Sequence, residues 1–150
     1  MQRKIILICV AAFVFMNVNI FAKQSANVTD SDVKLFAQEF PSIMDEIEAL
    51  DEYDEDETQY EDTKLLREIL VKHGFEEKDC VEKFNMILLC MSKMKIEKEM
   101  NNMPFFLKSM YKKKIKKELD KEINFDDEKV VRRNEKYLEE KLGSFFEEEE

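Results

Sequence analysis

The sequence predicts an all-α fold, a small bundle of four to five helices after a signal peptide, with an acidic linker between the first and second helices. Three observations support this prediction. The 150 residues include only two Gly and two Pro, too few for the turns of an all-β domain. Lys, Glu, Leu, Met and Ile, which favour helices, are abundant. Apolar residues recur at three- and four-residue spacing along most of the chain.

Residues 1–22 have the pattern of a secretory signal peptide. Arg3 and Lys4 form a basic start, and residues 5–16 are an unbroken apolar run before a more polar stretch that ends at Ala22. We expect cleavage after Ala22 and secretion of the remaining chain. The alternative is a membrane anchor that spans residues 5–22, but this uncharged stretch is marginal in length for a bilayer and contains two Asn.

Residues 23–30 are expected to form a flexible N-terminal stretch. It contains Asn27 in an Asn-Val-Thr sequon, which predicts N-glycosylation of a secreted chain. A single helical domain is then expected over residues 31–146, and the four Glu at 147–150 form an acidic tail.

The first helix follows N-cap candidates from Thr29 to Asp32. Pro41 lies inside its pattern, so we expect a kink or two short helices. Its apolar positions are Val33, Phe36, Phe40, Ile43, Ile47 and Leu50. Residues 45–62 then hold eleven acids and no base. Like charges at helical spacing repel, so residues 51–62 are expected to form a solvated linker.

A second helix is predicted over about 62–73, with Gly74 as its C-cap and His73 as a helix-end histidine that needs no ligand. The third helix, over about 76–100, is expected to be central because apolar residues lie on more than one of its sides. Its main apolar stripe is Cys80, Val81, Phe84, Ile87, Leu88, Met91 and Met94.

Pro104 suits the first turn of a fourth helix. The residues of this helix expected to face the core are Leu107, Met110, Tyr111, Ile115 and Leu119. Asn124 or Asp126 can cap a fifth helix, which Gly143 is expected to end. The apolar positions of the fifth helix are Val130, Val131, Tyr137, Leu138 and Leu142.

Cys80 and Cys90 are the cysteines that follow the signal peptide, and secretion would expose them to an oxidising compartment. On one continuous helix, ten residues correspond to about 15 Å of axial rise. A disulfide needs Cα atoms within about 7 Å. The two cysteines are therefore free, paired between two chains in a disulfide-linked dimer, or paired across a break in the helix.

Several classes of site are excluded by the motifs that the chain lacks. The two glycines stand 69 residues apart, so no glycine-rich dinucleotide loop, phosphate loop or Gly-x-Ser-x-Gly nucleophile motif is present. A single His and no compact Cys/His cluster argue against zinc, and no EF-hand loop occurs. We expect no enzymatic activity, no cofactor, no metal and no nucleic-acid partner.

The most distinctive feature is the acidic segment with its two tyrosines, which we call the acidic strip. Its members are Asp51, Glu52, Tyr53, Asp54, Glu55, Asp56, Glu57, Tyr60, Glu61 and Asp62. Tyrosines among acids on a flexible secreted segment are typical of tyrosine sulfation. Such a strip suits a basic extracellular protein, for example a protease exosite or a chemokine. The alternatives are a solubilising linker and loose Ca²⁺ binding.

The second feature is the basic patch, six lysines within ten residues that contain no acid: Lys108, Lys112, Lys113, Lys114, Lys116 and Lys117. Within residues 105–121 they predict an amphipathic helix that binds an anionic membrane or glycan, with the acidic segment as a shield. The alternative is a core-packing helix whose basic outer face attracts the acidic segment of the same chain. A third hypothesis for the whole protein is an extracellular structural protein with no discrete site.

No motif in this chain identifies a family. In layout, a signal peptide followed by an acidic segment and a small, cysteine-poor helical domain, the chain resembles some secreted salivary proteins of blood-feeding insects. The resemblance covers the whole chain, and no residue role is carried over from it. The function expected from sequence is a secreted, non-enzymatic binding protein that acts through the acidic strip.

Overall fold

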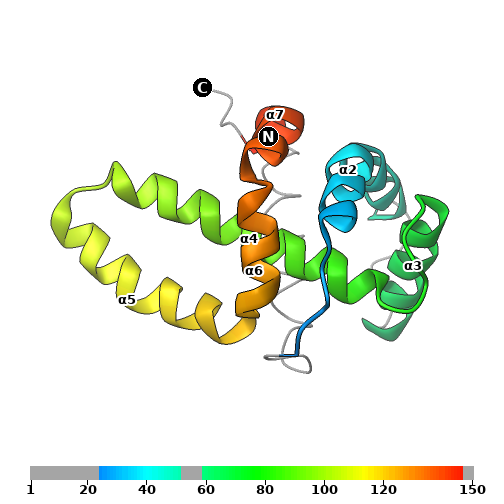
Figure 1. The fold of residues 1–150 in the computed structure, drawn as a ribbon, viewed down its shortest axis with the longest axis horizontal. Coiled ribbons are helices and arrows are strands. Elements are labelled where there is room, and N and C mark those ends of the chain that lie inside the picture. Colours follow the sequence, from blue (N-terminus) through cyan, green and yellow to red (C-terminus); the bar gives the residue numbers. More distant parts are fainter. Residues whose placement is uncertain (1–23, 52–58, 147–150) are drawn as a thin grey trace.

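The computed structural model describes residues 24–51 and 59–146. These residues contain no strand and form six helices, with α4 running through the middle (Figure 1). The helices are α2 (Asp30–Asp51), α3 (Gln59–Lys72), α4 (Cys80–Asn101), α5 (Phe105–Glu122), α6 (Phe125–Arg133) and α7 (Glu135–Phe146). The all-α class is confirmed, and the number of helices in the described part exceeds the four to five expected. The predicted signal peptide and acidic tail lie outside the described residues.

An extra helix arises because the predicted fifth helix is divided at Asn134. The Asn134 side-chain amide donates to Oδ1 of Asp30 at 2.6 Å. Arg133 donates to the two oxygens of the same carboxylate through Nε at 2.7 Å and Nη2 at 2.6 Å. Hydrogen bonds from Arg133 and Asn134 lower the pKa of Asp30 to about 2. The first residue of α2 is thus held at the break between α6 and α7, and Gly143 lies inside α7 rather than ending it.

Pro41, Asn124 and Pro104 were each expected to mark the start or the interruption of a helix. α2 is one helix of 22 residues with Pro41 inside it, so of the two expected outcomes, a kink or two short helices, the second is excluded. The side chains of Phe40 and Ile43, on either side of the proline, are fully buried and hold both halves against the core. Asn124 is the N-cap of α6, where its side chain accepts from two backbone N–H groups, as expected for this residue type. Pro104 occupies the N-cap position of α5.

The core forms around α4, which contacts α2, α3, α5 and α6, and the prediction of a central third helix is confirmed. Phe84 of α4 has its ring centroid 5.0 Å from that of Phe36 and 6.2 Å from that of Phe40, both on α2. Phe75, just before α4, meets the Phe84 ring edge-on at 6.4 Å. Such aromatic contacts stabilise a core beyond the area that they bury.

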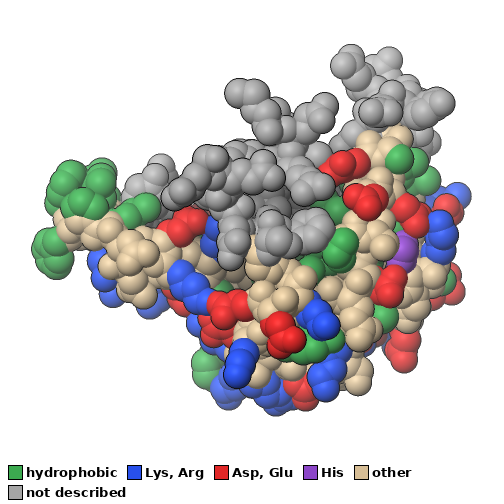
Figure 2. All heavy atoms as spheres, turned by 90° about the horizontal axis from the view of Figure 1, so that it is seen from above, with side chains coloured by type: hydrophobic (Ala, Val, Ile, Leu, Met, Phe, Trp, Pro, Cys, Tyr) green, Lys and Arg blue, Asp and Glu red, His purple; other side chains and the backbone are tan. Residues whose placement is uncertain are grey.

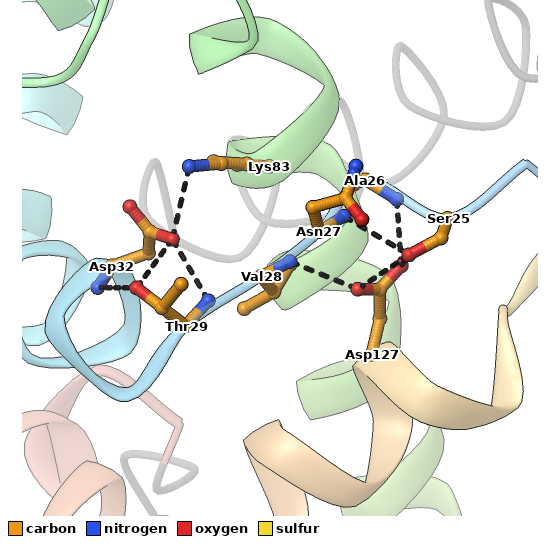
Figure 3. Close-up of polar contacts among 8 residues, drawn as sticks. All are labelled: Ser25, Ala26, Asn27, Val28, Thr29, Asp32, Lys83 and Asp127. Carbon is orange, nitrogen blue, oxygen red and sulfur yellow. Dashed lines mark hydrogen bonds and ion pairs between the residues drawn. The ribbon is translucent and has the colours of Figure 1, made fainter.

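Residues 24–29, which were expected to be flexible, form an extended strap against the helices (Figure 3). The carboxylate of Asp127, in the first turn of α6, accepts from the N–H groups of Ala26 at 2.7 Å and Val28 at 2.9 Å. The Ser25 hydroxyl donates to the same carboxylate at 3.2 Å. Ala26 and Val28 are buried and Asp127 is only 1% exposed. These hydrogen bonds and this burial explain why the stretch is packed.

The strap leads directly into the N-cap of α2. The backbone N–H and Oγ1 of Thr29 donate to Oδ2 of Asp32 at 2.8 and 2.7 Å, and the N–H of Asp32 donates to Oγ1 of Thr29 at 3.2 Å. This reciprocal pair is a capping box with Asp in the place of Glu. Nζ of Lys83, on α4, lies 3.1 Å from Oδ2 of Asp32 and joins the cap to the central helix (Figure 3).

The single histidine of the chain joins the end of α3 to α2. Nδ1 of His73 lies 2.7 Å from Oε2 of Glu39, and Nε2 lies 2.8 Å from Oε1 of Glu46. An ionised carboxylate only accepts, so both ring nitrogens donate and the imidazolium form is favoured. The hydrogen bond to Glu39 raises the pKa of His73, burial opposes this effect, and Glu46 adds to it. The sequence prediction of a helix-end histidine omitted both of these partners.

We expect the protein to lose stability as the pH rises above 6.5, the ordinary pKa of histidine. Because the folded-state pKa is raised, the contribution of His73 is complete below 6.5 and is lost as the pH rises through the folded-state value. The His73→Gln variant should lack this pH dependence. Urea denaturation at several pH values measures it, and an NMR titration of the only imidazole gives the pKa directly. A folded-state pKa at or below 6.5 would contradict the prediction.

Candidate functional site

The α4–α5 hairpin projects from the rest of the described structure (Figure 1). α4 ends at Asn101, and the Asn102 N–H donates back to the carbonyls of Glu99 and Met100. Pro104 then fixes an extended backbone, with φ −55° and ψ 144°, from which α5 begins. α5 packs mainly against α4. The turn between α4 and α5 therefore lies at one end of the described structure, with α3 at the opposite end (Figure 1).

Large apolar side chains gather at the turn of this hairpin. Phe105 is 88% exposed, Phe106 66%, Met110 69% and Leu107 36%, and we call these four residues the apolar tip. Figure 2 shows hydrophobic side chains clustered at this end of the molecule. Contiguous exposed apolar residues on a small protein mark a surface that contacts a partner or a membrane.

The apolar tip corrects the prediction that α5 packs into the core along its length. Leu107 and Met110 were expected to be core residues and are exposed, while Leu119 is buried as expected. The reason is that, among the described elements, the first half of α5 contacts α4 alone, and the junction with α6 begins at the other end. Tyr111 and Ile115 belong to α5, but their side chains lie outside the described set.

The basic patch lies on the same helix as the apolar tip. The side chains of Lys112, Lys113, Lys116 and Lys117 are exposed and that of Lys108 is half-buried, whereas that of Lys114 is not among the described ones. Lys108 donates to the Asn101 side-chain oxygen at 3.5 Å. Among the described side chains, no carboxylate lies within 4.0 Å of any of these five ammonium groups. The described lysines therefore present uncompensated positive charge beside the apolar tip.

A groove of about 290 Å³ runs between α4 and α5 next to the apolar tip. Its apolar floor is formed by Ile96, Met100 and Leu119. Its polar lining consists of Lys93, Glu97, Asn101, Lys108, Lys112 and Lys116. Lys108, Lys112 and Lys116 follow one another at four-residue spacing, so they form one stripe along α5. Lys113 and Lys117 form the neighbouring stripe and do not line this groove.

Lys93, at the inner end of the groove, belongs to an ion-pair cluster in which its own side chain and that of Glu128 are largely buried. Its Nζ lies 2.7 Å from Oδ1 of Asp120 and 2.9 Å from Oε1 of Glu128. Burial alone would lower the pKa of Lys93, but hydrogen bonds to the two carboxylates outweigh burial and raise it. Nη2 of Arg132 lies 2.7 Å from Glu97 and 2.8 Å from Glu128. This cluster joins α4, α5 and α6, and its two cations and three carboxylates leave one net negative charge at the inner end of the groove.

The described residues do not assemble the acidic strip. Asp51 is the last residue of α2, while Tyr60, Glu61 and Asp62 lie in the first turn of α3. The linker expected over residues 51–62 is therefore shorter than predicted. The other members of the strip, Glu52, Tyr53, Asp54, Glu55, Asp56 and Glu57, lie outside the described residues.

Cys80 and Cys90 are free, buried thiols on the continuous helix α4. Burial raises the pKa of Cys80 and raises that of Cys90 to about 12. A thiol that stays protonated is a poor nucleophile. The break in the helix that would allow an internal disulfide is not present in α4, and a disulfide between chains would require the buried Sγ atoms to become exposed.

Asn27, the predicted glycosylation site, is exposed on the strap in a left-handed conformation with φ 55°. Asn tolerates this conformation better than most residues. The backbone N–H of Asn27 donates to Oγ of Ser25 at 3.0 Å. An oligosaccharide on this side chain would extend into solvent without disturbing the buried neighbours Ala26 and Val28.

Neither a metal site, a membrane-spanning helix nor a known relative assigns a function to the described residues. No group of three or more His, Cys, Asp or Glu side chains is placed to hold a metal ion in the part of the chain that the structure describes. None of the described helices combines the length and the apolar character needed to span a bilayer. Comparisons with family models, curated proteins and solved structures give no match.

Proposed function

We propose that this is a secreted, non-enzymatic binding protein that attaches to anionic membrane surfaces through the apolar tip and the basic patch. The observation that carries the proposal is the exposure of Phe105, Phe106 and Met110 at a projecting turn beside lysines with no described counter-ion. Aromatic side chains insert into the boundary between headgroups and acyl chains. Each Lys close to an anionic bilayer adds about 1 kcal/mol.

The overall charge of −10 does not oppose this proposal. Exposed charges are screened beyond about 8–10 Å at physiological ionic strength. A membrane that touches the hairpin end therefore interacts mainly with the basic patch. Attraction to this end and repulsion from the rest of the molecule would together orient the protein with the apolar tip toward the bilayer.

Other occupants of this surface fit less well. A second copy of the chain, docked tip to tip, would bring two sets of lysines together, and like charges at an interface are unfavourable. A sulfated glycan would satisfy the lysines but offers no apolar region for Phe105 and Phe106. Binding of a basic protein by the acidic strip is a separate proposal that rests on sequence charge alone.

We expect the full chain without residues 1–22 to bind phosphatidylserine-containing vesicles and to show little binding to pure phosphatidylcholine vesicles. The Phe105→Ser/Phe106→Ser double variant should bind about 10- to 100-fold more weakly, since burying one Phe side chain contributes about 1.5–3 kcal/mol and insertion is partial. Vesicle co-sedimentation measures the binding of the unmodified protein and of the double variant. Raised salt should weaken binding to the anionic vesicles, because it screens the lysines.

Phe125→Ser is the matched control, because Phe125 is 68% exposed on α6 and lies outside the apolar tip. Its ring contacts Nζ of Lys129, 4.1 Å from the ring centroid, rather than any residue of the hairpin turn. The control variant should bind vesicles like the unmodified protein. Equal losses for Phe125→Ser and the double variant, or no binding to anionic vesicles at all, would refute the proposed function.

A further inference from the structure

We infer that the groove between α4 and α5 binds the phosphomonoester headgroup of a single anionic lipid, such as phosphatidic acid. This inference rests on the proposed function, because the apolar tip has to bring the groove to the membrane. It goes further by predicting lipid selectivity, which the apolar tip and diffuse positive charge do not provide.

The charges around the groove leave three ammonium groups available to a ligand. Lys93 is neutralised by Asp120 and Glu128. Glu97 is paired with Arg132. Lys108, Lys112 and Lys116 remain on the rim, and no described carboxylate pairs with any of them. Their four-residue spacing corresponds to about 6 Å of helix rise per step, so flexible lysine side chains from adjacent turns can converge on one anion.

A phosphomonoester suits these three lysines better than a phosphodiester headgroup does. It carries a charge of about −1.5 to −2 at neutral pH and presents three strong acceptor oxygens. The phosphate of phosphatidylserine carries a single charge, and the headgroup adds an ammonium group and a carboxylate, so its negative charge is spread over two separate groups and not concentrated on one phosphate. Each ammonium group is also attracted more strongly by a phosphate with nearly two charges than by a phosphate with one, since the Coulomb energy grows with the charge.

The shape of the groove fits a lipid rather than a free ion. Ile96, Met100 and Leu119 form an apolar floor beneath the lysine rim. A volume of about 290 Å³ holds a small headgroup with part of its glycerol. Lys108 and Asn101 lie at the end of the groove next to Phe105, so a phosphate held among the three lysines would sit at headgroup depth while the apolar tip reaches the acyl chains.

Two lysine pairs on the same helix allow a matched test. Lys112→Gln/Lys116→Gln removes two charges from the groove, and Lys113→Gln/Lys117→Gln removes two charges from the neighbouring stripe. Each variant and the unmodified full chain without residues 1–22 are titrated with phosphatidylcholine vesicles containing phosphatidic acid or phosphatidylserine, adjusted to equal zeta potential.

We expect the unmodified protein to bind phosphatidic acid vesicles about five- to tenfold more tightly than phosphatidylserine vesicles. The groove variant should lose this preference. The neighbouring-stripe variant should bind both lipids more weakly while keeping the preference. Excess glycerol 3-phosphate should not displace the protein, since insertion of the apolar tip supplies affinity that the free anion lacks.

The failures of the two proposals are distinguishable. Equal binding to both lipids, or equal effects of the two lysine variants, would overturn the headgroup site while leaving membrane attachment intact. Displacement from vesicles by glycerol 3-phosphate would show that the groove binds a soluble anion and would overturn the lipid assignment. No binding to either vesicle, with a folded protein shown by circular dichroism, would refute both proposals.

Discussion

Replacing Asp127 by alanine is expected to destabilise the protein by about 2–5 kcal/mol, because the N–H groups of Ala26 and Val28 would stay buried without a partner at a cost of about 1–3 kcal/mol each. Both N–H groups now donate to the Asp127 carboxylate, at 2.7 and 2.9 Å. Water cannot replace the carboxylate unless the strap detaches. Detachment would expose the buried side chains of Ala26 and Val28. The loss of stability in Asp127→Ala therefore cannot exceed the free energy that docking of the strap contributes to the fold.

Asp126→Ala is the control for this prediction. Asp126 is the preceding residue in the first turn of α6, but its side chain is 84% exposed and makes only a long ion pair with Lys129, at 3.6 Å. Its removal should cost less than about 1 kcal/mol. Urea denaturation gives both values, and hydrogen exchange should show faster exchange of the Ala26 and Val28 amides in Asp127→Ala alone. Similar losses for the two variants would show that Asp127 does not hold the strap.

Replacing Lys93 by methionine should cost about 3 kcal/mol, at the lower end of the range for breaking a buried ion pair. Methionine keeps the apolar stem of the side chain but removes the ammonium group that two carboxylates share. Glu128, with 13% of its side chain exposed, would keep only Arg132 as a counter-ion. Asp120 is 41% exposed and can be solvated, which keeps the cost from being larger.

Lys98→Met is the matched control, since Lys98 also lies on α4 and pairs with two acids. Its partners are Glu135, at 3.0 Å, and Glu139, and all three side chains are at least one-third exposed. Exposed pairs contribute about 0–1 kcal/mol. Urea denaturation of the two variants gives the change in the free energy of unfolding for a buried and for an exposed lysine on the same helix. In the Lys93→Met/Glu128→Gln double variant, part of the loss should be recovered, because the buried carboxylate that lost one of its two counter-ions is gone. A loss for Lys93→Met no larger than that for Lys98→Met would contradict the prediction.

Sequence periodicity predicted the helical class and the central position of α4, because apolar residues on several sides of one helix require neighbours on those sides. The capping role of Asn124 was also predicted from its residue type, whereas Pro104, predicted for the first turn of the fourth helix, lies one position earlier, at the N-cap of α5. The apolar tip was not, since the spacing of Leu107 and Met110 shows which side of a helix is apolar and not whether another element covers that side. Long-range contacts decide this, and they are not visible in a local pattern.

The strap and its anchor show the same limit. Ala26 and Val28 alternate with the polar residues Ser25 and Asn27, a two-residue period that could have indicated an extended segment with one buried face. Asp127, by contrast, is one of 34 acidic residues, and nothing nearby in the sequence distinguishes the buried one. The two glutamates that hold His73 are equally inconspicuous in a helix as acidic as α2.

The strap also has a consequence for the order of events during synthesis. Val28 and its anchor Asp127 are 99 residues apart, so the ribosome completes α6 long after residues 24–29 have emerged. At about 5–20 residues per second, the N-terminal stretch waits roughly 5–20 s for its docking partner. In an exported chain, signal cleavage and glycan transfer to Asn27 would take place in this interval, on an extended and accessible substrate. In such a chain, the strap would dock on Asp127 only after this processing.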